Sequence, residues 1–284
     1  MRAREIIFIS LIALGAGMLY SPMHELLKNA ARSEYYSHII LIPFVSGSLI
    51  YWNRNNLFTD VRYSVKNGSF LICLGILIYL IGFSHKNSLS QNDFTAVLTL
   101  GVIIFWMGAF LLSYGQKSLR LALFPLLFLF FMVPIPFLIL DRVIYFLQLG
   151  SAEITYLLFQ LLDIPVARSG FVFDLPKVSI EVAKQCSGIR SSLALFITSI
   201  LAAHFFLETG WKKVIFVLSI IPITIFKNGV RIVTLSLLAI YVDERFLTGG
   251  FLHRSGGIVF YIPALVLLGA ILLALKKTEK KSKS

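Results

Sequence analysis

The sequence predicts an all-α polytopic membrane protein, and three observations support this fold class. Hydrophobic residues make up 57% of the 284 positions and charged residues only 14%, and the mean hydropathy is +0.84. A water-soluble domain would carry about 25% charged residues. Apolar runs recur along the chain between short polar links, and a run of about 20 residues crosses ~30 Å of hydrocarbon. We therefore expect a single integral-membrane domain over residues 1–284 with about eight transmembrane helices.

The expected spans follow from the hydropathy of the chain. The first apolar run is longer than a signal-peptide core and has no small-residue cleavage site, so we expect it to be retained as a membrane helix. The spans are expected near residues 5–22, 36–52, 68–84, 94–114, 119–140, 187–207, 213–241 and 256–275.

The segment "DRVIYFLQLGSAEITYLLFQLLD", residues 141–163, is apolar enough for a further crossing, but the basic residues argue against one. A crossing here would place Lys212, Lys213 and the tail "KKTEKKSKS" outside, whereas Lys and Arg concentrate in cytoplasmic links. Polar positions 141, 148, 151 and 155 recur at helical spacing, as in an amphipathic helix that lies on the membrane. We expect an outer-interface helix, cytoplasmic termini and a basic cytoplasmic tail at 276–284. A re-entrant hairpin around "MVPIPF" is the alternative.

Charge and composition also exclude several classes of partner. The net charge of +12 does not indicate nucleic-acid binding, because the basic residues lie in links and in the tail, facing membrane lipids of a negative inner leaflet. The outer face has no HExxH pair and no clustered carboxylates, so no metal or other cofactor is expected. Two cysteines cannot form a disulfide framework, and Cys73 suits a small apolar position within a span.

The other cysteine stands in "EVAKQCSGIRSSLALF", at the outer mouth of the sixth expected span. Just upstream, the alternation in "FVFDLPKVSIEV" is typical of a short β-hairpin in an extracytoplasmic loop. Ser187 and Gly188 suit a helix start, where unpaired amide groups favour an anion and therefore the thiolate form of Cys186. This local pattern fits a reactive thiol, and it also fits a cysteine that only packs at the membrane boundary.

The next span contains two basic residues, Lys227 and Arg231, on one helical face of "FKNGVRIVTL". A mid-bilayer charge costs about 2.5–3.5 kcal/mol on insertion scales, so each side chain needs a partner or must snorkel. A helix that enters near residue 213 rises ~27 Å by Arg231, which places the guanidinium level with Cys186. His253 follows in the last outer link, "TGGFLHRSGGIVFY", directly before the eighth expected span.

A thiol, a guanidinium and an imidazole on one membrane face are the groups that a thiol acyl transferase needs. The imidazole can accept the thiol proton and return it to a leaving amine, while the guanidinium stabilises charge on the attacked carbonyl oxygen. The other histidines fit this arrangement less well. His204 is expected near the inner end of a span, His85 on a flexible link, and His24 and His38 far upstream.

At these residues the sequence resembles the exosortases, membrane-embedded cysteine transpeptidases related to the archaeosortases. "CSGIRSS", "NGVRIV" and "HRSGGIVFY" match that family's cysteine, arginine and histidine segments in order. "YSHIILIPF" and "FPLLFLFFMVPIPF" extend the likeness over most of residues 35–262. The resemblance implies catalytic roles for Cys186, Arg231 and His253. Histidine at the third position is typical of the bacterial branch, so we expect an inner-membrane protein whose active site faces the periplasm.

The resemblance also implies a substrate class and a mechanism. The substrates would be secreted proteins that end in a Pro-Glu-Pro-like motif, one transmembrane helix and a basic cluster, and their sorting accompanies exopolysaccharide production. Cleavage would pass through a thioester on Cys186. Arg190, Asn228 and His38 are the candidate substrate-binding residues. Arg190 can pair with the acidic residue of the signal, with a phosphate or with a neighbouring glutamate, and Asn228 can orient Arg231 or cap a helix kink.

A second class of function also fits the sequence, a transporter or lipid-binding scaffold in which Lys227, Arg231 and Arg190 hold an anion. Transporters often contain inverted repeats with paired broken helices. The first half of the chain contains no second "KNGVR"-like break. A carrier has no need of a thiol, so replacement of Cys186 distinguishes the two hypotheses.

Overall fold

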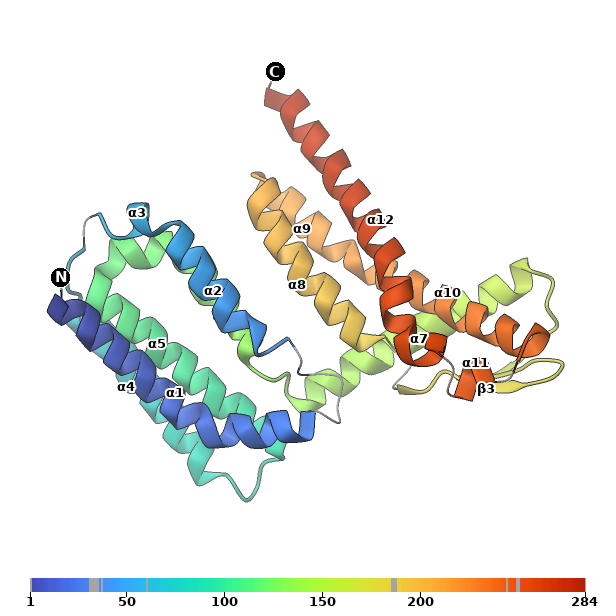
Figure 1. Ribbon diagram of the computed structural model, residues 1–284, viewed down its shortest axis with the longest axis horizontal. Coiled ribbons are helices and arrows are strands. Elements are labelled where there is room, and N and C mark those ends of the chain that lie inside the picture. The colour runs from blue at the N-terminus through green and yellow to red at the C-terminus, as the bar shows by residue number, and fades with distance from the viewer. Residues whose placement is uncertain are drawn as a thin grey trace. The chain divides into compact units, whose positions relative to one another are not determined.

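The computed structural model describes residues 2–30, 36, 38–59, 61–184, 188–243, 245–248 and 251–283 (Figure 1). The chain forms two compact units, Met1–Leu140 and Asp141–Ser284. The elements are α1 (Arg2–Ala30), α2 (Leu41–Trp52), α3 (Arg54–Leu57), α4 (Val65–Ser84), α5 (Gln91–Leu121), α6 (Leu123–Phe128), η1 (Leu129–Met132), α7 (Phe137–Leu161), β1 (Ala167–Ser169), β2 (Val172–Asp174), β3 (Ser179–Glu181), α8 (Ile189–Phe206), α9 (Gly210–Leu218), α10 (Ile220–Tyr241), α11 (Arg245–Thr248) and α12 (Phe251–Lys283).

Long apolar helices dominate both units and confirm the all-α polytopic membrane fold. In the described part of the chain, six helices are long and apolar enough to cross a membrane. Each coincides with one of the spans expected from the sequence. They are Ala3–Glu25, Val65–Ser84, Gln91–Leu121, Ile189–Phe206, Gly210–Tyr241 and Val259–Glu279.

The two other expected spans are shorter than the hydropathy indicated. In place of a span over 36–52, α2 has only 12 residues. The segment at 119–140 is broken at "VPIP", where Leu123–Met132 and Phe137–Leu161 meet at an angle of 87°, and the two parts are long and apolar enough to cross a membrane when taken together. Pro134 and Pro136 lack an amide donor and disfavour helical geometry in the residue before them, which accounts for the break. Counting that pair as one span gives up to seven.

The polar stripe of α7 faces the protein rather than water. Gln148 is 5% exposed, and Ser151 and Thr155 are fully buried. The exposed side chains of α7 include large apolar ones such as Tyr145 and Phe146. A helix that rests on the membrane turns its polar face to water, whereas a polar face buried in protein with an apolar face outside suits a lipid environment. The helical period of the stripe was therefore predicted correctly, but its burial was not.

In the first unit, glycines on α4 and α5 bring the two helix backbones into contact. A Cβ atom on Gly75 would lie 2.6 Å from the carbonyl oxygen of Gly101, and one on Gly101 would lie 2.8 Å from that of Gly75. Gly68 and Gly108, each seven residues away on the same helix, repeat this close approach. Membrane helices lack a hydrophobic driving force between them, so such small-residue contacts supply the packing.

In the second unit, the three strands form an antiparallel sheet in the order β1-β2-β3. Phe173 pairs with Ile180, so the β-hairpin expected from "FVFDLPKVSIEV" is confirmed, and β1 adds a strand that the sequence did not predict. Phe173 and Ile180 are buried in a cluster with Phe159 of α7 and Val233 of α10. The hairpin is therefore packed on these two helices.

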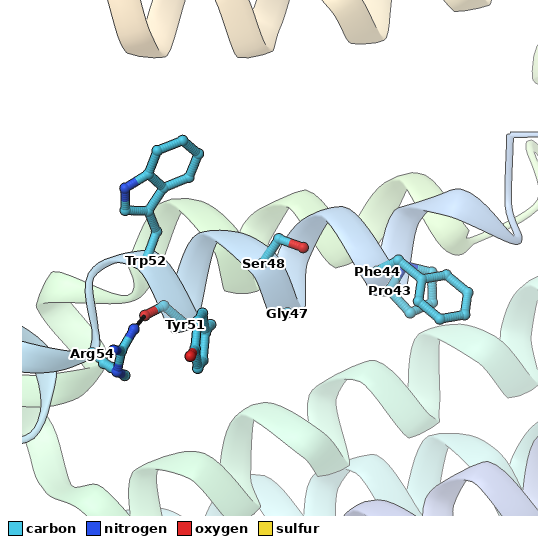
Figure 2. Close-up of a pocket in the computed structure, with 7 residues that line it drawn as sticks. All are labelled: Pro43, Phe44, Gly47, Ser48, Tyr51, Trp52 and Arg54. Carbon is cyan, nitrogen blue, oxygen red and sulfur yellow. Dashed lines mark hydrogen bonds between the residues drawn. The ribbon is translucent and has the colours of Figure 1, made fainter.

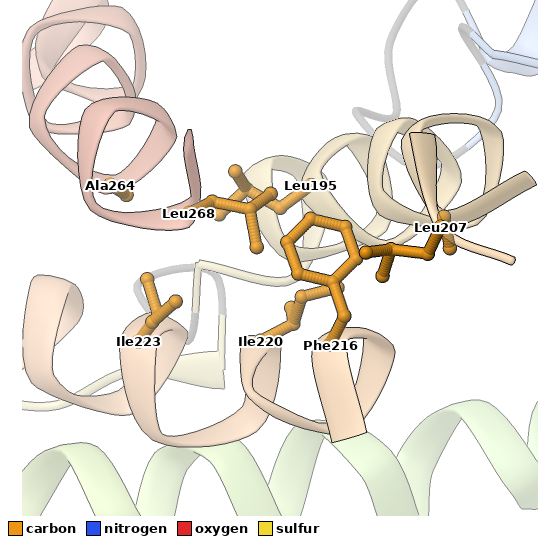
Figure 3. Packing of buried hydrophobic residues seen from close by; sticks show 8 residues of the cluster. Leu195, Leu207, Phe216, Ile220, Ile223, Ala264 and Leu268 are labelled. Carbon is orange, nitrogen blue, oxygen red and sulfur yellow. The ribbon is translucent and has the colours of Figure 1, made fainter. Parts of the chain in front are cut away.

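Helices α8, α9, α10 and α12 surround a second apolar cluster (Figure 3). Its members are Leu195, Ala203, Leu207, Phe216, Ile220, Ile223, Ala264 and Leu268. One end of this bundle is held by polar contacts of the C-terminal segment. The Glu279 carboxylate accepts hydrogen bonds from the backbone amides of Glu208 and Thr209, and Lys212 donates to Thr278 at 3.1 Å. The basic tail is part of α12, which extends to Lys283. Since these contacts lie beyond the end of α8, the start of α8 lies at the opposite end of the bundle.

The glycine contact between α4 and α5 gives a direct test of the packing. We expect Gly75→Ala to destabilise the protein by about 1–3 kcal/mol, because its Cβ would overlap the α5 backbone. Gly17→Ala is the matched control, since a Cβ there meets nothing within 4 Å. Thermal unfolding in detergent should show a lower midpoint for Gly75→Ala alone. Equal midpoints for the two variants would contradict the close α4–α5 contact.

Candidate functional site

The three predicted catalytic residues are described to different extents. Arg231 lies in α10 and is partly buried. His253 belongs to the first turn of α12, and its side chain lies outside the described residues. Cys186 is outside them altogether, so the site is built here from the residues on either side of it.

The turn that follows Cys186 in sequence is fixed by hydrogen bonds to one carbonyl. Gly188 is the N-cap of α8 and has φ 73° and ψ 15°, in the left-handed region that glycine adopts most readily. Its carbonyl oxygen accepts from the backbone amide of Ser192 at 3.0 Å and from the hydroxyls of Ser191 and Ser192 at 2.9 and 2.7 Å. The start of α8 is therefore a well-defined turn.

Two polar side chains of α10 pack against this turn. Lys227 donates a hydrogen bond to the Ser191 hydroxyl. A Cβ atom on Gly188 would lie 3.1 Å from Asn228 Oδ1 and 3.6 Å from Lys227 Nζ. Lys227 is 7% exposed and Asn228 is fully buried. Lys227 does not snorkel to the surface, because its partner lies in the first turn of α8.

The same part of α10 is joined to α7. Asn228 donates through Nδ2 to the Ser151 hydroxyl at 3.0 Å, and that hydroxyl donates to the carbonyl of Leu147 at 2.6 Å. A Cβ atom on Gly229 would lie 2.5 Å from Cγ2 of Ile154. The α10 helix is continuous through Gly229, so this glycine permits a close helix crossing rather than a kink.

Arg231 lies one turn beyond Lys227 on the same face of α10. Its Nε is buried and has no hydrogen-bond acceptor in the part of the chain that the structure describes. A buried donor without an acceptor costs about 1–3 kcal/mol. An anionic group that accepted a hydrogen bond from the Arg231 Nε would remove this cost, so the site favours such a group. Two cations on one helix face strengthen that preference for negative charge.

The chain that leads into the cysteine segment is held as well. Gln148 of α7 donates through Nε2 to the carbonyl of Val182, and the Val182 amide donates to the carbonyl of Phe171 at 2.9 Å. Lys184 forms an ion pair with Asp141 at 2.9 Å. The polar pattern of residues 141–163 had singled out Gln148 and Ser151, but their contacts with the hairpin exit and with α10 were not predicted.

The backbone of His253 lies toward the same end of the bundle as Gly188. Glu279, near the end of α12, meets the α8–α9 connection, so the beginning of α12 points toward the beginning of α8. Ala264 packs in the apolar cluster with Leu195, and residue 253 lies ~16 Å before it along a helix. The turn before α8 and the first turn of α12 therefore share one end of the second unit.

Arg190 and His38 are the other two candidate substrate-binding residues. Arg190 is exposed at the second position of α8. His38 belongs to the first unit, in the turn before α2 and outside the long apolar helices. Burial lowers the pKa of His38, and a hydrogen bond with the backbone of Phe131 partly offsets that effect.

A hollow of about 700 Å³ lies along α2 (Figure 2). It is lined by Pro43, Phe44, Gly47, Ser48, Tyr51, Trp52 and Arg54. Arg54 donates to the carbonyl of Tyr51 at 3.0 Å, and none of the predicted catalytic residues borders this hollow. Over the described residues, no group of three His, Cys, Asp or Glu side chains could hold a metal ion.

Comparison with known families adds the observation that decides the family. A family model described as transmembrane exosortase matches residues 29–270, which include Cys186, Arg231 and His253. The chain belongs to the transmembrane exosortase family. This match confirms the family predicted from the sequence. Exosortases are membrane proteases and transpeptidases with a role in protein sorting. No curated protein and no solved structure matches the chain.

The left-handed Gly188 provides a test of the contact between α8 and α10 in this exosortase. We expect Gly188→Ala to destabilise the protein by about 1–2 kcal/mol, because alanine is strained at this φ and its Cβ would crowd Asn228. Gly210→Ala is the matched control, since Gly210 also begins a helix but its Cβ would meet nothing within 4 Å. Thermal unfolding in detergent distinguishes the two. An unchanged midpoint for Gly188→Ala would show that the turn is not built as described.

Proposed function

We propose that this exosortase cleaves the C-terminal sorting signal of secreted proteins through an acyl-enzyme thioester on Cys186. The contact of the charged face of α10 with the first turn of α8 is the observation that supports the proposal most. Gly188, two residues after Cys186, lies against Lys227 and Asn228. Because consecutive Cα atoms are 3.8 Å apart, the Cα of Cys186 is within about 7.6 Å of that of Gly188 by chain geometry alone.

The chemistry proceeds in two halves with a balanced transfer of protons. His253 takes the proton of the Cys186 thiol, the resulting thiolate attacks the scissile carbonyl carbon, and Arg231 stabilises the negative charge on the carbonyl oxygen. Collapse of this intermediate breaks the C–N bond, and the departing amine of the signal takes a proton from His253. His253 then removes a proton from the incoming nucleophile, water or an amine, whose attack on the thioester releases the acyl group and restores the thiol.

Substrate recognition in this proposal uses the exposed surface around the same turn. Arg190, at the second position of α8, would pair with the acidic residue of a Pro-Glu-Pro-like motif. Asn228 would support Arg231 from within α10. The tail helix of the substrate would lie in the bilayer, which reduces the entropy cost of bringing the scissile bond to the thiol.

The location follows from the same proposal. The multi-pass protein would reside in the inner membrane with cytoplasmic termini and a periplasmic active site, and its substrates would be proteins sorted alongside exopolysaccharide production.

The contact that supports the catalytic proposal also argues against an anion carrier, because Lys227 already donates to Ser191 within the protein. An anion carrier would need that ammonium group for its cargo.

Processing of a reporter substrate tests the proposed function. The reporter is a secreted protein that ends in a Pro-Glu-Pro motif, one apolar helix and a basic cluster, expressed beside each variant. We expect tail removal to fall at least about 10³-fold in Cys186→Ala, Arg231→Ala and His253→Ala, because each removes a group that acts on the reacting atoms.

Cys73→Ala and His85→Ala are the matched controls, since Cys73 lies within α4 and His85 is exposed at its end. Both should process the reporter as the wild type does. Mass spectrometry should detect a covalent reporter adduct only on proteins that retain Cys186. Normal tail removal by Cys186→Ala would end the transpeptidase proposal.

A further inference from the structure

We propose that Gln148 and Lys227 are positioning residues that hold the chain on either side of Cys186, at Val182 and at the first turn of α8, and that the rate of attack by the thiol depends on these two contacts. This inference depends on the proposed function, in which Cys186 is the nucleophile. Neither residue is assigned a contact with the substrate. Each acts through a hydrogen bond to the chain on one side of the cysteine.

The first hold is at Val182, where the hairpin ends. Gln148 is 5% exposed and donates to the Val182 carbonyl, while the Val182 amide donates to Phe171. Both backbone polar groups of Val182 are therefore bonded. The Val182 side chain is itself buried at 1% exposure in the cluster between the hairpin, α7 and α10. The chain thus leaves the hairpin at a fixed point.

The second hold is at Gly188, where α8 begins. Lys227 donates to the Ser191 hydroxyl, which in turn donates to the Gly188 carbonyl at 2.9 Å. The ammonium group therefore acts on the turn through one intervening serine. Replacement of the lysine by an apolar residue would leave the Ser191 hydroxyl without its buried donor and would loosen the contact between α10 and this turn.

The two helices that make these contacts, α7 and α10, are also bonded to each other. Asn228, next to Lys227, bonds to Ser151, which lies three residues after Gln148 on α7. The helices approach closely on both sides of this bond, because Cβ atoms on Gly150 and Gly229 would lie 2.8 Å from Ile225 and 2.5 Å from Ile154. Since α7 and α10 are joined between the two holds, the ends of the segment from Val182 to Gly188 keep a fixed separation.

The energetic cost of Lys227 favours a specific role over simple packing. A lysine within a membrane helix costs about 2.5–3.5 kcal/mol on insertion scales, and a leucine or methionine would fill the same space without that cost. Catalysis is sensitive to position, since a misplacement of about 1 Å can lower a rate by ~100-fold. A loosened segment should therefore slow the chemical step while leaving the binding of the signal unchanged.

The test measures kcat and KM of the purified full-length protein in detergent. The probe is a fluorogenic peptide with a Pro-Glu-Pro motif, an apolar helix and a basic cluster. We expect Lys227→Met and Gln148→Met each to lower kcat by about 10- to 100-fold, with KM within about twofold of the wild type. Lys227→Arg keeps the charge and the donors, so it should recover about tenfold of the loss in Lys227→Met.

The chain offers a matched control for each variant. Lys212 is as buried as Lys227, at 6% exposure, and donates to Thr278 at the other end of the same bundle. Lys212→Met should therefore lower the unfolding temperature while keeping kcat near that of the wild type. Gln160→Met changes an exposed glutamine of the same helix as Gln148 and should leave both constants unchanged.

The outcomes separate this inference from the proposed function. Cleavage of the peptide by Cys186→Ala would overturn the proposed function, and the inference with it. An inactive Cys186→Ala together with a normal kcat in Lys227→Met and Gln148→Met would overturn the inference alone. A loss confined to KM, or an equal loss of kcat in Lys212→Met, would also overturn it. If Lys227→Met does not fold, Ser191→Ala removes the same link from the other side and should lower kcat with KM unchanged.

Discussion

A buried ammonium group inside an apolar helix needs a hydrogen-bond partner, and in this protein the first turn of α8 provides it. Lys227 donates to Ser191, and Ser191 donates to the carbonyl of Gly188. Lys227 is only 7% exposed, so leaving its ammonium group without an acceptor would cost several kcal/mol. This constraint fixes the position of α10 relative to Gly188 and the start of α8. Asn228 extends the same constraint to α7 through Ser151.

The remaining contacts of the second unit build on that arrangement. The hairpin packs on α7 and α10 around Phe173 and Val233, and it delivers the chain to Val182. The apolar cluster of α8, α9, α10 and α12 fills the middle of the bundle (Figure 3). Glu279 and Lys212 close its far end with polar contacts. Polar contacts at both ends and apolar packing between them oppose sliding of the helices, as the proposed site on three separate segments would require.

The sequence predicted those features whose signals are local or periodic. Hydropathy located the six long helices, strict alternation predicted the hairpin, and the helical spacing of Lys227 and Arg231 placed them on one face. Other features depend on contacts between segments. The polar stripe at Gln148, Ser151 and Thr155 revealed a helical face, but periodicity does not say whether such a face meets water or protein. The segment "MVPIPF" had suggested a re-entrant hairpin as an alternative, but hydropathy averaged over 119–140 favoured a continuous span and did not show the break at Pro134 and Pro136.

In the candidate site, too, the motifs could be predicted from the sequence, whereas the contacts between segments could not. The order of the cysteine, arginine and histidine segments was sufficient to predict the exosortase family. The left-handed Gly188 and the contact of the Ser191 hydroxyl with Lys227 could not be predicted, because a glycine and a serine near a helix start are common and only the packing of α10 gives them a specific role. The glycine contacts between α4 and α5 in the first unit could not be predicted either, because they depend on which helix packs against each glycine.

Cross-linking between Cys186 and α10 tests the central claim most directly. In a Cys73→Ala background, an Arg231→Cys substitution introduces a second thiol, and a short bis-methanethiosulfonate reagent joins thiols that lie close together. Ile215→Cys, an exposed position on α9 toward the other end of the bundle, is the control. Peptide mass spectrometry should show a cross-link between position 231 and Cys186 and none between position 215 and Cys186. Absence of the first cross-link, or equal yields of the two, would contradict the account.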